Sequence, residues 1–147
     1  MKIISRTLIT AIALAIASVA LAEGEPSDPH VKAWEDLMKQ NGGAVKVLAD
    51  MAGGKATFDA DAASQAKETL VVASAKIPET FKDQATDPAS EAKPEIWTNW
   101  DDFVAKANAL NTAATALDVA SLDTLKAGMG AIGGACKDCH TTYRIMN

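Results

Sequence analysis

The chain has 147 residues and a net charge of −5, from 14 basic and 19 acidic side chains. Its length allows one domain with a substantial hydrophobic core. Its acidic balance argues against binding to nucleic acid or anionic lipid, and favours a partner protein with a basic docking patch.

The first 22 residues have the pattern of a cleaved secretory signal peptide. Lys2 and Arg6 precede an apolar run that ends in Ala20-Leu21-Ala22. This run is shorter than the roughly 20 residues that span a bilayer, and its small-residue ending favours cleavage over a membrane anchor. We therefore expect a periplasmic domain, residues 23–147, that is not inserted in the membrane. Loss of the two basic residues lowers their count from 14 to 12 against 19 acidic ones, which changes the net charge from −5 to −7.

Apolar residues recur at helical spacing through the rest of the chain, and no alternating strand pattern is evident. The first helix is predicted over residues 29–52, with Asp28 as its cap and Gly53-Gly54 at its end. Gly42-Gly43 interrupts it, and each glycine costs about 1 kcal/mol relative to alanine. Either another group approaches the backbone closely there, or the helix is bent or broken. The apolar stripe of this helix comprises Val31, Trp34, Leu37, Met38, Ala44, Val45, Leu48 and Met51.

The second helix is predicted over residues 60–77, with Asp59 as its cap and Pro78 as its stop signal. Its stripe consists mainly of small residues, which allow close packing against a neighbour. Residues 78–93 are rich in Pro, Asp, Ser, Thr and Glu. This composition predicts a surface loop.

The third helix is predicted over residues 94–117, and the fourth over residues 122–145 with Ser121 as its cap. The fourth contains four glycines, which would weaken an isolated helix. We therefore expect its backbone to pack closely on a cofactor or a neighbouring helix. Four amphipathic helices with one core predict an all-α, antiparallel four-helix bundle.

The segment Cys136-Lys137-Asp138-Cys139-His140 lies near the end of the fourth helix. C-x-x-C-H is the attachment signal for c-type haem, and the offsets i, i+3 and i+4 place the three side chains on one helical face. The alternatives are a redox dithiol or a structural disulfide, but a thioredoxin-type motif expects a βαβ setting that is not evident here. The predicted cofactor is one covalently attached haem c. A flat apolar cofactor needs apolar side chains to pack against it. The candidates for haem contact in the third helix are Trp97, Trp100 and Phe103.

A second axial iron ligand would have to come from the haem face opposite His140. Met129 and Met146 belong to the same helix as His140 and cannot readily wrap around the porphyrin. Met38 and Met51 remain, both in the first helix. They lie thirteen residues apart, about 20 Å at 1.5 Å per residue, so at most one of them can reach the iron.

Two alternatives stay open at this point. His30 in the first turn of the first helix is a rival ligand, although a histidine at a helix terminus is usually solvated. The sixth coordination position could also remain empty. A methionine in an apolar stripe is more often core packing than a ligand, so the residues alone do not choose among these possibilities.

The chain resembles the class II c-type cytochromes, the cytochrome c′ family, over nearly the whole mature length. The resemblance depends on the position of C-x-x-C-H on the last of four helices. Its most specific segments are residues 133–140 followed by Tyr143-Arg144, residues 94–97 and residues 37–42. The last of these, Leu-Met-Lys-Gln-Asn-Gly, is similar to the low-spin branch, in which a methionine of the first helix is the sixth iron ligand. The resemblance therefore implies that Met38 binds iron opposite His140.

The same resemblance implies that Arg144 lies near His140 and the haem and tunes the site. Helical spacing would place it one turn after that histidine, on the same face. The positive charge of Arg144 could instead complement the negative C-terminal end of the helix, and this role is compatible with tuning the haem site.

The implied function is that of a soluble periplasmic electron carrier with one low-spin haem. Redox partner proteins are its expected partners. The alternative is a five-coordinate, high-spin relative that binds nitric oxide or carbon monoxide. No catalytic acid/base pair or nucleophile is evident, so an enzyme is not expected. A monomer and a homodimer are both compatible with the sequence.

Overall fold

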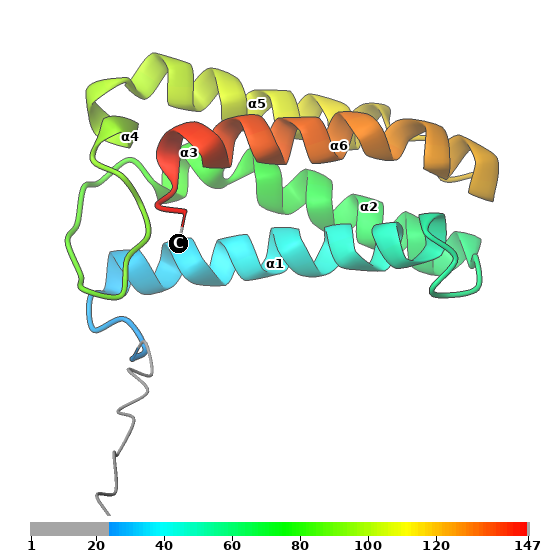
Figure 1. Ribbon diagram of the computed structural model, residues 1–147, viewed down its shortest axis with the longest axis horizontal. Helices are drawn as coiled ribbons and strands as arrows, with labels where there is room; N and C mark the ends of the chain where they lie inside the picture. The colour runs from blue at the N-terminus through cyan, green and yellow to red at the C-terminus, as the bar shows by residue number, and fades with distance from the viewer. Residues whose placement is uncertain (1–23, 147) are drawn as a thin grey trace, which may run out of the picture.

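The computed structural model describes residues 24–146 of the chain (Figure 1). The predicted signal peptide, residues 1–22, lies outside this range. Among the helices of residues 24–146, none has the length and apolar character needed to cross a membrane.

Four long helices form the predicted antiparallel four-helix bundle (Figure 1). They are α1, Pro29–Ala52; α2, Ala60–Ala75; α5, Trp100–Ala116; and α6, Leu122–Tyr143. Each packs against two others, in the cyclic order α1, α2, α5, α6. The first and last helices of the chain are therefore neighbours, and this adjacency positions the candidate site.

The first helix is continuous over the predicted residues. Asp28 caps it, because its side chain accepts hydrogen bonds from the backbone N–H groups of His30 (2.8 Å) and Val31 (3.2 Å). The helix is neither broken nor interrupted at Gly42-Gly43. A Cβ atom at either glycine would meet no protein atom within 4 Å, so no other described part of the chain requires a glycine there.

The predicted third helix, residues 94–117, is in fact divided. A single-turn helix α4, Glu95–Thr98, is followed by Asn99 with φ −122° and ψ 46°, and only then by α5. The indole N–H of Trp97 donates to the carbonyl oxygen of Phe81 (2.8 Å). This hydrogen bond ties α4 to the connector between α2 and α5, which explains why α4 leaves the axis of α5.

The core is one cluster shared by all four long helices. Leu48, Leu70 and Leu125 are completely buried at its centre. Of the four glycines of α6, Gly128 has the close neighbour that was expected, because a Cβ atom there would collide with the side chain of Leu117. The other three glycines meet no protein atom within 4 Å.

The connector predicted as a plain surface loop contains buried residues. It begins with a second single-turn helix, α3, Ile77–Thr80, and continues with Phe81, which is only 6% exposed. The carboxylate of Asp87 is also buried, and it accepts hydrogen bonds from the backbone N–H groups of Ser27 (2.8 Å), Asp28 (2.9 Å) and Ala89 (2.8 Å). The Ser27 hydroxyl donates to it as well (2.8 Å). The connector is thereby fastened to the start of α1.

The fourth helix ends at Tyr143, two residues earlier than predicted. Arg144 is extended, with φ −115° and ψ 139°, because its segment pairs with the connector. The N–H of Lys93 donates to the Tyr143 carbonyl (2.9 Å), and the N–H of Ile145 donates to the Glu91 carbonyl (2.7 Å). Arg144 is therefore the C-terminal cap of α6 rather than a helical residue, and its N–H still bonds to the carbonyl oxygen of His140 one turn before it (3.0 Å).

The anchoring role of Asp87 predicts a specific pH dependence. Hydrogen bonds from Ala89, Asp28 and Ser27 lower the pKa of Asp87 to about 2. A depressed carboxyl pKa stabilises the fold above the ordinary pKa of about 3.9, and this stabilisation is lost as the pH falls towards 2. We expect Asp87→Ala to unfold at lower urea concentration than the wild type at pH 7, with a difference that shrinks between pH 4 and pH 2. Asp87→Asn, which keeps an acceptor oxygen, is the control and should lie between them. A pH-independent difference for Asp87→Ala would contradict this role.

The end of α6 yields a second stability prediction. The Tyr143 hydroxyl donates to Oδ2 of Asp102 on α5 (2.5 Å), and burial together with this bond raises the pKa of Tyr143 to about 12. Tyr143→Phe should lower the free energy of unfolding by about 1.5 kcal/mol, the lower end of the range for a charged acceptor, because the exposed Asp102 regains water. Urea unfolding measures this difference. An unchanged midpoint would show that the hydrogen bond makes no net contribution.

Candidate functional site

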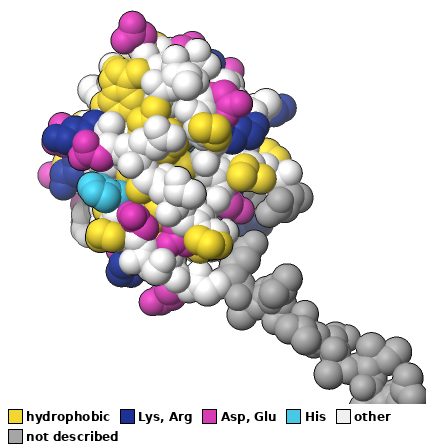
Figure 2. All heavy atoms as spheres, turned by 90° about the vertical axis from the view of Figure 1, so that its left-hand side faces the viewer, with side chains coloured by type: hydrophobic (Ala, Val, Ile, Leu, Met, Phe, Trp, Pro, Cys, Tyr) yellow, Lys and Arg dark blue, Asp and Glu magenta, His cyan; other side chains and the backbone are white. Residues whose placement is uncertain are grey.

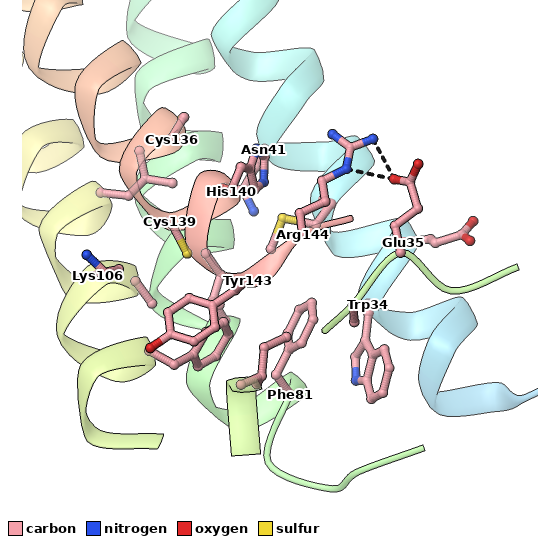
Figure 3. Close-up of a pocket in the computed structure, with 18 of the residues that line it drawn as sticks. Trp34, Glu35, Asn41, Phe81, Lys106, Cys136, Cys139, His140, Tyr143 and Arg144 are labelled. Carbon is pink, nitrogen blue, oxygen red and sulfur yellow. Dashed lines mark hydrogen bonds and ion pairs between the residues drawn. The ribbon is translucent and has the colours of Figure 1, made fainter. Parts of the chain in front are cut away.

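A cavity of about 540 Å³ lies between α1, α5, α6 and the connector (Figure 3). Most of its lining is apolar, and its polar groups are few and come from different elements. The residues of the lining that could contact a cofactor include Trp34, Met38, Asn41 and Gly42 from α1, Phe81, Glu91 and Ala92 from the connector, Phe103 and Lys106 from α5, and Cys136, Cys139, His140, Tyr143 and Arg144 from the end of the chain.

The α6 wall contains the C-x-x-C-H motif. Cys136, Cys139 and His140 lie on one face because residues separated by three or four positions in a helix point in similar directions. All three are partly buried and line the cavity, and both cysteines are free thiols. The sequence prediction that these side chains share one site agrees with their placement.

Burial is the main influence on the protonation states of the two thiols and the imidazole on this wall. It raises the pKa of Cys136 and raises the pKa of Cys139 to about 11, so both thiols are protonated at neutral pH. Burial, and next the nearby Arg144 cation, hold the pKa of His140 below its ordinary value. The imidazole is therefore neutral at pH 7, which is the form that can coordinate a metal.

The α1 wall contains Met38. Its side chain is partly buried, packs against the core and lines the cavity. Trp34 and Gly42, one turn before and one turn after it, line the same wall. The rival residues lie elsewhere: Met51 is buried in the core, and His30 is exposed at the start of α1. Within residues 24–146, Met38 is the one methionine that lines this cavity.

The three aromatic residues predicted to contact a haem are not placed alike. Phe103 is buried and lines the cavity, whereas Trp97 and Trp100 do not. Trp100 packs on Phe103, with ring centroids 5.5 Å apart, and Trp97 packs on Trp34, at 5.3 Å. The two tryptophans therefore form a second layer behind the lining rings.

Several lining residues were not identified from the sequence as site residues. Trp34 and Asn41 could have been found, because they lie four residues before and three after Met38 on the same helical face. Phe81 could not, since it follows a different helix and reaches the cavity by stacking on Trp34, with centroids 5.1 Å apart.

Two ion pairs at the cavity also required the tertiary structure. Arg144 binds the connector residue Glu91, with Nε 2.7 Å and Nη2 2.5 Å from Oε2. Lys106 of α5 binds Asp138 of α6, with Nζ 2.5 Å from Oδ2. Each pair joins residues more than thirty positions apart, so no local sequence pattern predicts these pairs.

The donor set and the shape of this cavity fit a covalently attached haem. One wall offers two thiols and a neutral imidazole, the α1 wall offers a thioether, and apolar rings close the remaining sides. These are the side chains that attach and ligate haem c. A side chain at Gly42 would project towards open space on the α1 wall, so its absence leaves room for a flat group. The buried Oδ1 of Asn41, on the same wall, has no hydrogen-bond partner within the chain.

Comparison with known proteins agrees with this fit. A model of the protein family described as Cytochrome C' matches residues 30–144. Cytochrome c-556 of Agrobacterium fabrum is 39% identical over 120 residues, which cover 79% of this chain and 81% of the relative. The solved cytochrome c′ from Rhodobacter spheriodes superposes with a TM-score of 0.75 at 30% identity, covering 80% of this chain and 96% of that one.

One further similar structure was solved with a gas ligand bound. A variant of cytochrome c′ from Alcaligenes xylosoxidans, solved in the ferrous form with NO bound, superposes with a TM-score of 0.70 at 26% identity. The superposition covers 80% of this chain and 94% of that one. The family match spans most of the chain and includes every residue of the C-x-x-C-H motif. The chain therefore belongs to the cytochrome c′ family, whose members are c-type cytochromes with covalently attached haem c.

Proposed function

We propose that this protein is an electron carrier with one haem c, attached through Cys136 and Cys139 and ligated by His140 and Met38. The observation that carries the proposal is the position of Met38. It lines the same cavity as the C-x-x-C-H motif, from the wall formed by α1 rather than α6. Met/His ligation raises the reduction potential of haem iron.

The bound haem would supply one-electron chemistry. The residues of the chain bind it, orient it and keep water away from it. Two thioether bonds to α6 would hold its position, and the neutral imidazole of His140 can donate its lone pair without first losing a proton. Met38 would hold the iron from the α1 wall and leave no open position for an external ligand.

The apolar rings around the cavity form the expected haem environment. Phe103 would contact the haem directly, while Trp97 and Trp100 would support the lining rings from behind. Exclusion of water by such a shell favours the less charged, reduced state of the cofactor. Arg144 would tune the site from the cavity wall, where Glu91 holds its guanidinium.

The expected partners are redox proteins in the periplasm, reached after removal of the proposed signal peptide. The net charge of the whole chain is negative, which favours a basic docking patch on the partner. On the end of the bundle near the connector, acidic and basic side chains are interspersed (Figure 2). Docking on this face would therefore depend on individual ion pairs rather than on a field of one sign.

The second candidate function is binding of nitric oxide or carbon monoxide at an open sixth position. It is favoured by the similarity to the Alcaligenes protein solved with NO. The two functions differ in one bond. The carrier requires Met38 on the iron, whereas the gas-binding protein requires that position to be free.

The absorption spectrum of the purified holoprotein tests this choice. We expect low-spin bands for the wild type in both oxidation states and no prompt change with carbon monoxide. Met38→Ala should give a high-spin spectrum that changes rapidly with carbon monoxide, because removal of the thioether opens the sixth position.

Met51→Ala is the matched control, since Met51 lies on the same helix but in the core. It should keep the low-spin spectrum while losing roughly 2–5 kcal/mol of stability, the usual cost of such a truncation. A high-spin wild type, or a spectrum unchanged by Met38→Ala, would remove Met38 from the iron.

A further inference from the structure

One ion pair joins two of the long helices at the haem-attachment motif. Nζ of Lys106 on α5 lies 2.5 Å from Oδ2 of Asp138 on α6. Asp138 stands between Cys136 and Cys139. The other ion pairs of residues 24–146 join residues three or four positions apart, or tie Arg144 to the connector. The contact between Lys106 and Asp138 is therefore a distinct feature of the attachment site.

The two partners do not lie equally close to the cavity. Lys106 is a lining residue whose side chain is only 20% exposed, whereas Asp138 does not line the cavity and is 65% exposed. Figure 3 shows Lys106 on the side of the cavity where Cys139 lies. Lys106 thus lines the cofactor space at one edge, its ammonium pairs with Asp138, and the carboxylate of Asp138 faces solvent.

A second carboxylate nearby is already engaged. Asp102 lies one turn before Lys106 on α5, and its Oδ2 accepts a hydrogen bond from the Tyr143 hydroxyl (2.5 Å). Asp138 is consequently the group that holds the ammonium in place. The stem of Lys106 lies along the apolar wall, as long basic side chains commonly do, while its charge reaches the neighbouring helix.

We propose that the positive charge of Lys106, which Asp138 holds at the edge of the cavity, raises the reduction potential of the bound haem. Oxidation adds one positive charge to the haem, and a nearby cation disfavours that change. The side chain of Lys106 is 20% exposed, and salt screens a partly buried charge less than a fully exposed one. The inference requires only that haem occupies this cavity, and it does not depend on Met38 as a ligand.

A purely structural role predicts something different. A pair with one largely exposed partner contributes little to stability. If the pair acted only by bracing α6 against α5, loss of either partner would loosen the same contact. Both variants would then shift the potential in the same direction, or not at all. A charge effect requires shifts of opposite sign, because Lys106→Met leaves an anion and Asp138→Asn leaves a cation.

The test is redox titration of the holoprotein and its variants. Lys106→Met should lower the ratio of reduced to oxidised protein at a fixed applied potential by about three- to tenfold, or roughly 30 to 60 mV at 59 mV per tenfold. Asp138→Asn keeps an oxygen that can accept from the Lys106 ammonium but removes the countercharge, so it should move the potential in the positive direction. Lys106→Arg should leave the potential close to that of the wild type. Lys137→Met is the matched control. It removes the same charge from an exposed neighbour of Asp138 that does not line the cavity, and it should cause a smaller shift than Lys106→Met.

Each outcome bears on the proposal. Shifts of one sign for Lys106→Met and Asp138→Asn, or equal shifts for Lys106→Met and Lys137→Met, would overturn it. If Lys106→Met does not take up haem, the absence of a positive shift in Asp138→Asn would overturn it alone. The absorption spectrum of each variant reports the axial ligands separately. Failure of the proposed His/Met ligation would therefore appear in the spectrum of the wild type, whereas failure of this inference would appear in the potentials.

Discussion

The structure depends on one packing constraint: α1 and α6, from opposite ends of the chain, must face each other across a cavity without closing it. A row of aromatic rings meets this constraint. Trp34 stacks on Phe81 at 5.1 Å, Phe81 packs on Phe103 at 5.5 Å, and Phe103 meets the edge of Tyr143 at 5.4 Å. These contacts join α1, the connector, α5 and α6, so rigid rings rather than flexible chains keep the helices apart.

Polar contacts fasten the parts of the chain that the helices alone would leave loose. Asp87 fixes the connector to the start of α1, and the backbone bonds around Glu91 fix the other end of the connector to the last residues of the chain. The connector is therefore part of the cavity wall. This explains why Arg144 leaves the helix: two backbone bonds and an ion pair in the extended conformation replace one further helical turn.

Charged groups line both walls of the cavity, but they are held in different ways. Beside the neutral imidazole of His140, the ion pairs of Arg144 with Glu91 and of Lys106 with Asp138 join segments far apart in the chain. On the α1 wall, Met38 and the buried amide of Asn41 lie near the ion pair of Lys39 with Glu35 (3.2 Å), which joins residues of one helix. A cofactor held between these walls would therefore meet ion pairs on both sides and a soft thioether on the α1 side.

The amino-acid sequence by itself determined what depends on spacing within one helix. The four long helices and the shared face of Cys136, Cys139 and His140 follow from local periodicity and capping. The tertiary structure decided the rest: the break at Asn99, the extended Arg144, the place of Phe81 in the cavity wall and the pairing of Lys106 with Asp138. The physical reason is that helical periodicity relates residues three or four positions apart. Which contacts form between residues thirty or more positions apart depends on how the helices pack and on which side chains fit into the space between them.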